Sequence, residues 1–263
     1  MKRSGPDIDL ILPRWASRDG TGDPRDGEGV TAFFTTRNTG WNAGGDEAAV
    51  SGLNLGLNTA DPPERVHRNR ERLFEALALD PEWVALAGQV HGTHVRCVSA
   101  GGTYPETDGL VTRVPGLALG IQVADCAAVL LWEPAARVVG AVHAGWRGAA
   151  GGILPRALEV MKGEGGDPEK MHAFVSPCLS QARFEVGEEV AEQFPEDFVD
   201  RESHRKPHLD LKGFLLQELA DAGMDPSRVE VHPGCTLTNQ KYYSWRRQGE
   251  QSGRMMGVVG LAS

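Results

Sequence analysis

The sequence predicts a single α+β domain in which mixed β-sheets pack with helices. Predicted strands and helices alternate irregularly along the chain, which favours an α+β arrangement. Several predicted strands are nearly continuous apolar runs, as expected where both faces of a sheet are covered. The 263 residues contain no visible repeat or convincing linker, so one large domain accommodates them.

The domain is predicted to span residues 30–263, after a flexible amino-terminal segment at residues 1–29. Residues 14–29 are polar and rich in Gly and Asp, which is typical of a solvated loop. The sequence VTAFFTTR at 30–37 has the β-branched and aromatic residues of a strand. A loop is then expected over 38–52, where glycine and polar residues are frequent.

A helix is predicted over 62–79, because prolines suit a first turn and Val66, Leu73 and Leu77 follow helical spacing. Asp61 directly precedes it and is a natural N-cap residue, since a carboxylate can accept a hydrogen bond from a free backbone amide. This is the only helix predicted before residue 146, and it separates the first predicted strand from a group of later ones.

The central third of the chain is expected to supply most of the sheet. The sequence WVALAGQVHG is predicted to be a strand that ends at His91. Residues 110–134 suggest two buried strands that flank Cys126, and residues 136–144 a third that ends at His143.

The carboxyl-terminal part predicts helices followed by strands. A helix after the GWRG turn places four apolar residues on one face, namely Ile153, Leu154, Leu158 and Met161. Two more helices are expected over 186–194 and 209–222, and strands over 229–236 and 254–261.

Composition excludes several classes of protein. The formal net charge is −9, which argues against a nucleic-acid or anionic-membrane surface, although a few arginines in a pocket can still bind a small phosphorylated ligand. No apolar segment reaches the length of a membrane span, and the first residues lack the pattern of a secretory signal. The four cysteines are widely spaced without a CxxC pair, which favours free thiols or metal ligands in a cytoplasmic protein.

Three residues stand out as candidate metal ligands: His91, Cys126 and His143, in the sequences GQVHG, VADCAAV and AVHAGWRG. One thiolate and two imidazoles form a ligand set of catalytic zinc, in which the fourth position stays open to water or substrate. Taken singly, a buried cysteine or a hydrogen-bonded histidine in the core is the more common situation. The metal site therefore depends on the three residues meeting in space.

Further polar residues near these motifs are candidates for catalysis or substrate binding. Asp125 could orient a ligand or act as a general base, and Arg147 could hold an anionic oxygen or stack on a planar ring. Arg37, Asn54 and Gln89 are assigned to substrate binding. For each of these residues a structural ion pair or turn contact is the alternative.

A second group of candidates lies in YYSWRRQGEQSGR, where three arginines stand near aromatic residues: Arg246, Arg247 and Arg254. This stretch is either a basic surface loop or a set of contacts to a substrate phosphate.

Read in order, the motifs resemble the laccase-domain or polyphenol-oxidase-like family, which is associated with purine nucleoside phosphorylase activity. The resemblance covers about residues 30–261 and includes FFTTR, SGLNLGLNT, RNRERL, GQVHG, TDGLVT, VADCAAVLL, AVHAGWRG, FEVGEEV, CT, SWRR and GR. Two departures are SPCLS at 176–180, where a GP-C-I-type sequence is usual, and ADCAAV, where proline commonly follows ADC. Neither removes a candidate ligand, but both can change the pocket wall.

The resemblance implies a single domain of mixed sheets and a zinc ion held by His91, Cys126 and His143. It also implies phosphorolysis of adenosine, inosine and methylthioadenosine to a free base and a pentose 1-phosphate, with adenosine deamination at the same site. A purine nucleoside and inorganic phosphate are then the partners. We add the hypothesis that Arg147 or Arg37 positions the phosphate.

Three other functions are compatible with the same residues. Multicopper oxidation is disfavoured, because it needs about ten histidines, whereas this chain has 8 and no His-x-His pair; copper could still enter the three-ligand site in vitro. A metal-independent hydrolase would use Cys126 as nucleophile and His143 as base. A zinc-stabilised binding module would perform no catalysis. The sequence does not indicate the oligomeric state.

Overall fold

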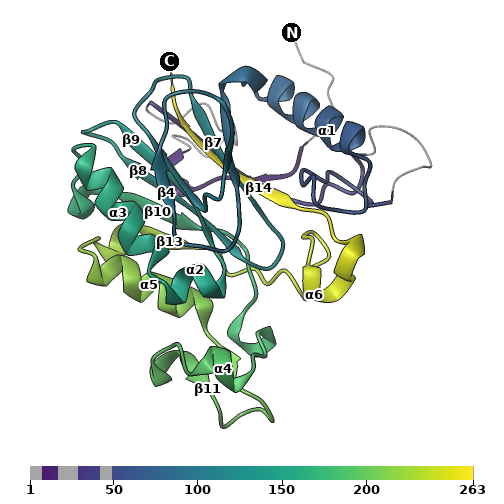
Figure 1. The fold of residues 1–263 in the computed structure, drawn as a ribbon, viewed down its shortest axis with the longest axis vertical. Helices are drawn as coiled ribbons and strands as arrows, with labels where there is room; N and C mark the ends of the chain where they lie inside the picture. The colour runs from purple at the N-terminus through teal and green to yellow at the C-terminus, as the bar shows by residue number, and fades with distance from the viewer. Residues whose placement is uncertain (1–7, 17–28, 42–48, 263) are drawn as a thin grey trace.

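Two six-stranded sheets stacked face to face form the centre of the computed structural model, which describes residues 8–16, 29–41 and 49–262. Helix α1 (Pro63–Ala76) covers the outer face of one sheet, and helices α3 (Ile153–Gly163) and α5 (Leu211–Asp221) cover the other, as Figure 1 shows. The layers therefore run helix, sheet, sheet, helix. The predicted α+β domain with mixed sheets is confirmed.

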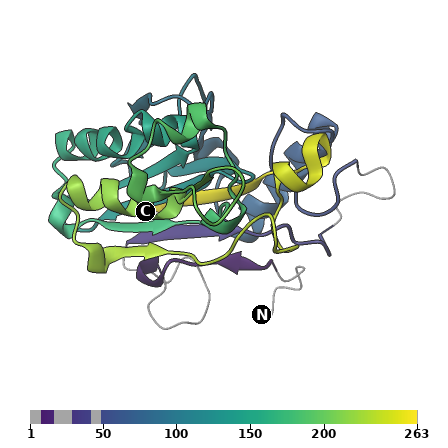
Figure 2. The same cartoon turned by 90° about the horizontal axis from the view of Figure 1, so that it is seen from below.

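The first sheet has the order β1-β2-β14-β7-β3-β5 and contains both parallel and antiparallel pairs. Its strands are β1 (Leu10–Ile11), β2 (Val30–Thr35), β14 (Met255–Leu261), β7 (Ala118–Val123), β3 (Val84–Gly88) and β5 (Gly102–Pro105). Strand β14 pairs antiparallel with β2, so the last strand of the chain lies beside an early one, in yellow and purple in Figure 2.

The second sheet has the order β13-β10-β8-β9-β6-β4. Its strands are β13 (Val229–Val231), β10 (His172–Val175), β8 (Ala127–Glu133), β9 (Val138–Ala144), β6 (Gly109–Thr112) and β4 (Val95–Cys97). Strand β8 is continuous in sequence with β7 except for residues 124–126, so the chain passes from the first sheet to the second within three residues. A small third sheet pairs β11 (Val199–Asp200) with β12 (His208–Leu209).

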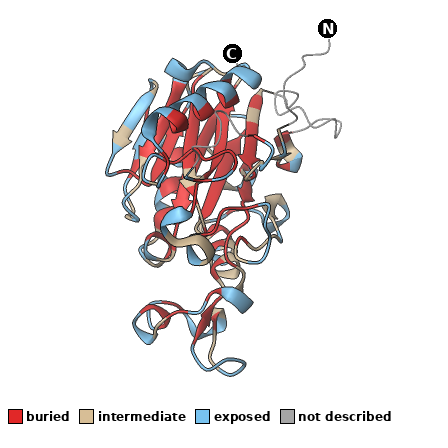
Figure 3. Ribbon diagram, turned by 90° about the vertical axis from the view of Figure 1, so that its right-hand side faces the viewer, coloured by how far each residue is buried: buried red, intermediate tan, exposed pale blue. Residues whose placement is uncertain are grey.

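The remaining helices are short. They are α2 (Trp146–Ala150), α4 (Glu188–Ala191), α6 (Trp245–Gln248) and the 3₁₀ turns Arg14–Ala16, Pro81–Trp83, Pro168–Lys170, Gln181–Arg183, Glu196–Phe198, Pro226–Arg228 and Gly249–Gln251. The segment with α4, β11 and β12 extends away from the two sheets, at the bottom of Figures 1 and 3. In Figure 3 the central strands are buried, whereas the outer faces of the helices are exposed.

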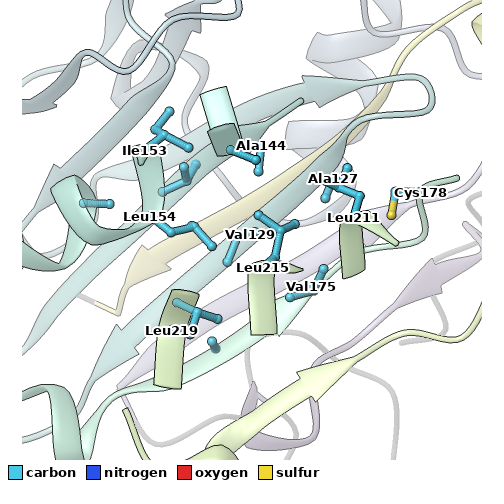
Figure 4. Close-up of a cluster of buried hydrophobic side chains, with 14 of the residues drawn as sticks. Ala127, Val129, Ala144, Ile153, Leu154, Val175, Cys178, Leu211, Leu215 and Leu219 are labelled. Atoms are coloured by element: carbon cyan, nitrogen blue, oxygen red, sulfur yellow. The ribbon is translucent and has the colours of Figure 1, made fainter. Parts of the chain in front are cut away.

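The continuous apolar runs are explained by side chains that alternate between two interlayer cores. In β8, Val129 and Leu131 pack toward α3 and α5, whereas Leu130 and Trp132 pack between the sheets. Figure 4 shows side chains of α3 and α5 meeting those of the second sheet. A third cluster fills the space between α1 and the first sheet. No helix among the described residues is long and apolar enough to cross a membrane.

The predicted elements are largely confirmed, but the residues at which they begin and end differ from the prediction. The helix predicted over 62–79 is α1, and Asp61 does not cap it: the N-cap residue is Pro62, without a side-chain hydrogen bond. Asp61 instead lies buried against Arg65, with its Oδ1 2.6 Å from Nη1. The carboxylate is engaged there because it also accepts the Val50 amide at 3.0 Å.

The later elements are shorter than predicted. The helix expected over 186–194 is limited to the single turn of α4, and the strand expected over 229–236 ends at Val231. In the amino-terminal segment, Leu10 and Ile11 pair with β2, and the flexibility predicted for the rest falls largely on residues 17–28, outside the described part of the chain.

Candidate metal centre

The three candidate ligands meet because the chain passes between the sheets at one end of the fold. Strands β3 and β7 are parallel neighbours, so their carboxyl ends lie at the same edge, and His91 and Cys126 follow them. Strand β9 runs antiparallel to β8, with His143 opposite Ala128, which brings this histidine beside Cys126. Residues from three separate stretches of sequence thus converge at one edge.

The ligand atoms of His91, Cys126 and His143 all lie within 4.8 Å of one another. The two imidazole rings stand edge to face, with centroids 4.7 Å apart. His143 is buried, Cys126 is half-buried and His91 is exposed, so the trio is open on one side. Convergence of these three residues was the condition for the predicted metal site, and the geometry meets it.

His91 lies in a turn rather than at the end of a strand. Strand β3 ends at Gly88, three residues before His91, whose φ of 61° is left-handed. This turn directs the amides of Val90, His91 and Gly92 toward one carboxylate, that of Asp108, at 3.2, 3.0 and 2.8 Å. Three successive amides around an anion fix the turn and therefore the position of the His91 side chain.

Asp108 also holds His143. Its Oδ1 lies 2.7 Å from Nδ1 of His143, and its backbone oxygen accepts the His143 amide at 2.7 Å. Burial would raise the pKa of Asp108, but hydrogen bonds from His143 and Gly92 outweigh this effect and leave the pKa below its usual value. The ionised carboxylate accepts a hydrogen bond from Nδ1, so Nε2 of His143 is the ring nitrogen that would bind a metal, after losing its own proton.

The charges of Cys126 and His143 are coupled. Burial alone would raise the pKa of the Cys126 thiol, but His143 and His91 more than offset it and lower the pKa to about 6. Burial would lower the pKa of His143, yet Cys126 and Asp108 raise it to about 9. The site therefore stabilises a thiolate, which is the form of cysteine that binds metals and attacks electrophiles.

The donor set fits a zinc ion. Tetrahedral zinc with one sulfur and two nitrogen ligands separates the ligand atoms by roughly 3.4–3.6 Å, so the three atoms lie within reach of one ion. Gly145 keeps the space above them clear: a Cβ at this position would stand 2.9 Å from Sγ of Cys126 and 3.2 Å from Cδ2 of His91. Zinc and copper both accept such ligands, and the donor set alone does not separate them.

The open side of the trio faces a cleft of about 970 Å³. Besides the trio, the predicted functional residues that line it are Gln89, Asp125, Arg147, Arg246 and Arg254. The Asp125 carboxylate accepts the Thr236 hydroxyl at 2.6 Å and the Arg246 amide at 2.8 Å. Both amide atoms of Gln89 bond the backbone of Gln122, at 2.7 and 2.8 Å, so this side chain joins the β3 end to β7.

Two of the predicted substrate-binding residues lie elsewhere. Arg37 is not part of the cleft lining: it donates to the Ser51 carbonyl at 3.2 Å and stacks on Tyr243. Asn54 is fully buried behind the cleft wall, where its Oδ1 accepts the amide of Arg254 at 2.9 Å. Neither Arg37 nor Asn54 is among the residues that line this cleft.

Sequence reasoning missed several residues of the site. Asp108 stood within the motif TDGLVT but was not singled out, and Arg70, Phe184 and Trp245 also line the cleft. Arg70 comes from α1, Phe184 from the segment that precedes α4, and Trp245 from α6. Each stands in one of the motifs quoted above, RNRERL, FEVGEEV and SWRR. No spacing connects these motifs, and the fold brings them together. Leu179, within the divergent SPCLS stretch, lines the cleft as well.

The fold and the site define a two-sheet α+β protein in which two histidines and one cysteine, a group that could hold a metal ion, line an open cleft. Comparison with known families is consistent with the resemblance seen in the motifs. The chain belongs to the family described as multi-copper polyphenol oxidoreductase laccase, whose model matches residues 31–262.

Relatives of this chain carry a name that differs from the family description. A Deinococcus radiodurans protein named purine nucleoside phosphorylase is 42% identical over 237 residues, which cover 88% of this chain and 89% of that protein. A Corynebacterium glutamicum protein of the same name is 34% identical and covers 91% of this chain and 97% of its own length.

Solved structures share the fold. The YlmD protein of Geobacillus stearothermophilus matches with a TM-score of 0.82 at 29% identity, covering 89% of this chain and 93% of that chain. A Neisseria meningitidis protein matches with a TM-score of 0.80 at 31% identity, covering 97% of this chain and 99% of that one.

Proposed function

We propose that this chain is a zinc-dependent purine nucleoside phosphorylase. The observation that carries the proposal is the His91, Cys126 and His143 trio, which opens into a cleft lined by arginines. Two relatives named purine nucleoside phosphorylase align with most of the chain and support it. A thiolate and two imidazoles suit zinc, and cationic side chains in the same cleft suit phosphate.

The proposed substrates are adenosine, inosine and methylthioadenosine. In the reaction, a phosphate oxygen forms a bond to C1′ of the pentose while the bond from C1′ to the purine nitrogen breaks. The electron pair of that bond leaves with the base, which takes up the proton released by phosphate. The products are a free purine and a pentose 1-phosphate. Adenosine deamination to inosine is proposed as a side activity of the same cleft.

The residues of the chain divide this work. The cleft arginines attract the phosphate and balance its charge, and the walls exclude water from the reacting bond. Asp125 positions the start of α6, since it binds the Arg246 amide. Asp108 fixes His91 and His143. A zinc ion bound to the trio would supply a Lewis acid for a substrate atom.

The test is metal analysis of the purified protein, followed by incubation with adenosine in the presence and absence of phosphate. Adenine and ribose 1-phosphate that form only with phosphate support phosphorolysis, whereas inosine marks deamination. Dialysis against a chelator is expected to abolish turnover and zinc to restore it. Stoichiometric copper and oxygen consumption with a phenol would instead support the oxidase.

A metal-independent hydrolase is the second candidate function, because the Cys126 pKa of about 6 also suits a nucleophilic thiol. A hydrolase that uses Cys126 and His143 would remain active after chelation and would be blocked by iodoacetamide. Turnover that is lost with the metal and regained with zinc rejects this alternative. A zinc-stabilised binding module would lose thermal stability on chelation and consume no nucleoside under any condition.

A further inference from the structure

The cleft arginines fall into an outer and an inner pair. Arg147 and Arg246 are exposed, and each guanidinium stacks on an aromatic ring of the cleft, at 4.2 Å from Trp146 and 5.0 Å from Phe184. Arg70 is 8% exposed, and Arg254 is half-buried. The two pairs therefore meet different amounts of water, and the inner pair offers the less hydrated positive charge.

Arg70 reaches the cleft from α1 and is held by neutral acceptors. Its Nε and Nη2 donate to the Leu55 carbonyl at 2.9 and 2.7 Å, and Nη2 also donates to Oε1 of Gln122 at 3.2 Å. Burial lowers the pKa of Arg70 to about 10. Nη1 has no acceptor, and no carboxylate pairs with this guanidinium, among the described residues.

Arg254 is placed by its backbone and its stem. Its amide donates to Asn54, and its carbonyl accepts the Leu55 amide at 3.1 Å. Gly56 makes room for the stem, since a Cβ there would stand 2.3 Å from Cγ of Arg254. Nη1 of Arg254 donates to the carbonyls of Ser252 and Gly253. Nε and Nη2 of the same side chain have no acceptor in the described part of the chain.

The segment Asn54–Gly56 connects the two inner arginines. The carbonyl of Leu55 accepts the Arg70 guanidinium, and the amide of the same residue binds the backbone of Arg254. Two carboxylates, Glu106 and Asp125, also line the cleft, but neither forms an ion pair with this inner pair. The charges of Cys126 and Asp125 favour the charged form of Arg254, but burial outweighs them. Neither guanidinium forms a salt bridge among the described residues, so two partly desolvated cations remain that an anionic ligand would stabilise.

We propose that Arg70 and Arg254 form an oxyanion subsite that binds inorganic phosphate, whereas Arg147 and Arg246 contact the outer part of the substrate. The assignment of phosphate as the anion depends on the proposed phosphorylase function. Inorganic phosphate is a mixture of the monoanion and the dianion at neutral pH, and two guanidinium groups can balance the charge of either form. A guanidinium with free N–H groups also matches the geometry of a tetrahedral oxyanion.

The test measures binding of inorganic phosphate to the zinc-loaded protein by isothermal titration calorimetry. Arg70→Met and Arg254→Met keep most of the stem and remove the charge, and each is expected to weaken phosphate binding by about tenfold or more. Arg68→Met is the matched control, because Arg68 is an exposed residue of the same helix. It is expected to bind phosphate as the wild type does.

Phosphate affinity that is unchanged in both inner variants, or absent from the wild type, overturns the subsite. A greater loss of phosphate affinity in Arg147→Met than in Arg70→Met and Arg254→Met would place phosphate at the outer pair. That result would also overturn the proposed subsite. Circular dichroism and thermal melting check folding. If a Met variant unfolds, Arg70→Lys and Arg254→Lys replace it, and they are expected to retain part of the affinity because they keep the charge.

Steady-state kinetics separates this inference from the proposed function. If phosphorolysis occurs, the inner variants are expected to raise KM for phosphate about tenfold or more while KM for the nucleoside changes less than about threefold. If no nucleoside is phosphorolysed but the inner variants still lose phosphate binding, the function fails and the anion subsite stands. If phosphorolysis occurs with an unchanged phosphate KM, the function stands and the subsite fails.

Discussion

The carboxylate of Asp108 connects two of the three candidate metal ligands, since it accepts Nδ1 of His143 at 2.7 Å and the backbone amide of His91 at 3.0 Å. This one buried carboxylate thus sets the ring orientation of His143 and fixes the turn that carries His91. Carboxylates that hold ligand histidines in this way raise the basicity of the imidazole and select its tautomer.

Asp108→Asn is therefore expected to weaken zinc binding by about 10- to 100-fold. An amide at this position loses the charge and replaces one acceptor oxygen with a donor, which faces the amides of Val90 and Gly92. Competition against a chromophoric chelator measures the affinity. Asp197→Asn is the control, because Asp197 is exposed and distant in sequence from the site. Equal zinc affinities for the two variants would show that Asp108 does not support the ligands.

Gly145→Ala is expected to weaken zinc binding without unfolding the protein. The added methyl group would stand 2.9 Å from Sγ of Cys126, so the thiolate must move away from the position that it shares with the histidines. Gly163→Ala is the matched control, since a Cβ at that position, the last residue of α3, meets nothing within 4 Å. The same chelator competition and a thermal melt of each metal-free variant provide the comparison. A zinc affinity equal to that of the control contradicts the steric argument.

The sequence predicted mixed sheets packed with helices and the three candidate ligands, because these depend on local signals. Alternating burial on both faces of β8 produces a continuous apolar run, and His91, Cys126 and His143 lie in distinctive motifs near strand ends. The end of β3 was placed three residues too late, since the Gly88 to His91 turn is defined by a contact with Asp108, 17 residues beyond His91.

The rest of the cleft depends on long-range contacts that leave no local pattern. Asp61 has the features of an N-cap residue, yet it pairs with Arg65 because the loop at Val50 folds over it. Asn54 and Arg254 are 200 residues apart in sequence and meet where the Arg254 amide donates to the side-chain oxygen of Asn54. Such pairs follow from the packing of whole layers, so single-residue features could not assign Arg37 or Arg70 to the right side of the cleft wall.

Loss of one partner of the buried Asp61 and Arg65 pair is expected to destabilise the protein. Arg65→Met leaves the carboxylate of Asp61 without its cation, at a position that is 3% exposed. Removing one partner of a buried pair decreases the free energy of unfolding by about 3–5 kcal/mol, which urea denaturation can measure. Lys170→Met, in the exposed pair with Asp167, is the control and is expected to leave the urea midpoint unchanged. Equal midpoints for the two variants would mean that the buried pair contributes no stability.

Glu218 makes stability dependent on pH in a direction that one substitution can reveal. Burial among the residues of α5, and secondarily the charge of Asp221, raises the pKa of Glu218 to about 8, and its Oε2 is buried without a hydrogen-bond partner among the described residues. Because this pKa lies above the unfolded value of 4.5, the folded state holds the proton more tightly. The stability from the neutral carboxyl group is complete below that unfolded value and is lost as pH rises through 8.

Glu218→Gln mimics the protonated side chain. Its Tm is therefore expected to equal that of the wild type at pH 5 and to exceed it at pH 9. An increase of about 2–8 °C in Tm at pH 9 corresponds to a gain of about 1–2 kcal/mol for a chain of this size. Differential scanning calorimetry of both proteins at pH 5 and pH 9 shows how the difference in Tm between them changes with pH. Glu159→Gln, on an exposed position of α3, is the matched control and is expected to give the same difference at both pH values. A Glu218→Gln effect that is independent of pH would show that this carboxyl group does not titrate in the folded protein between these values.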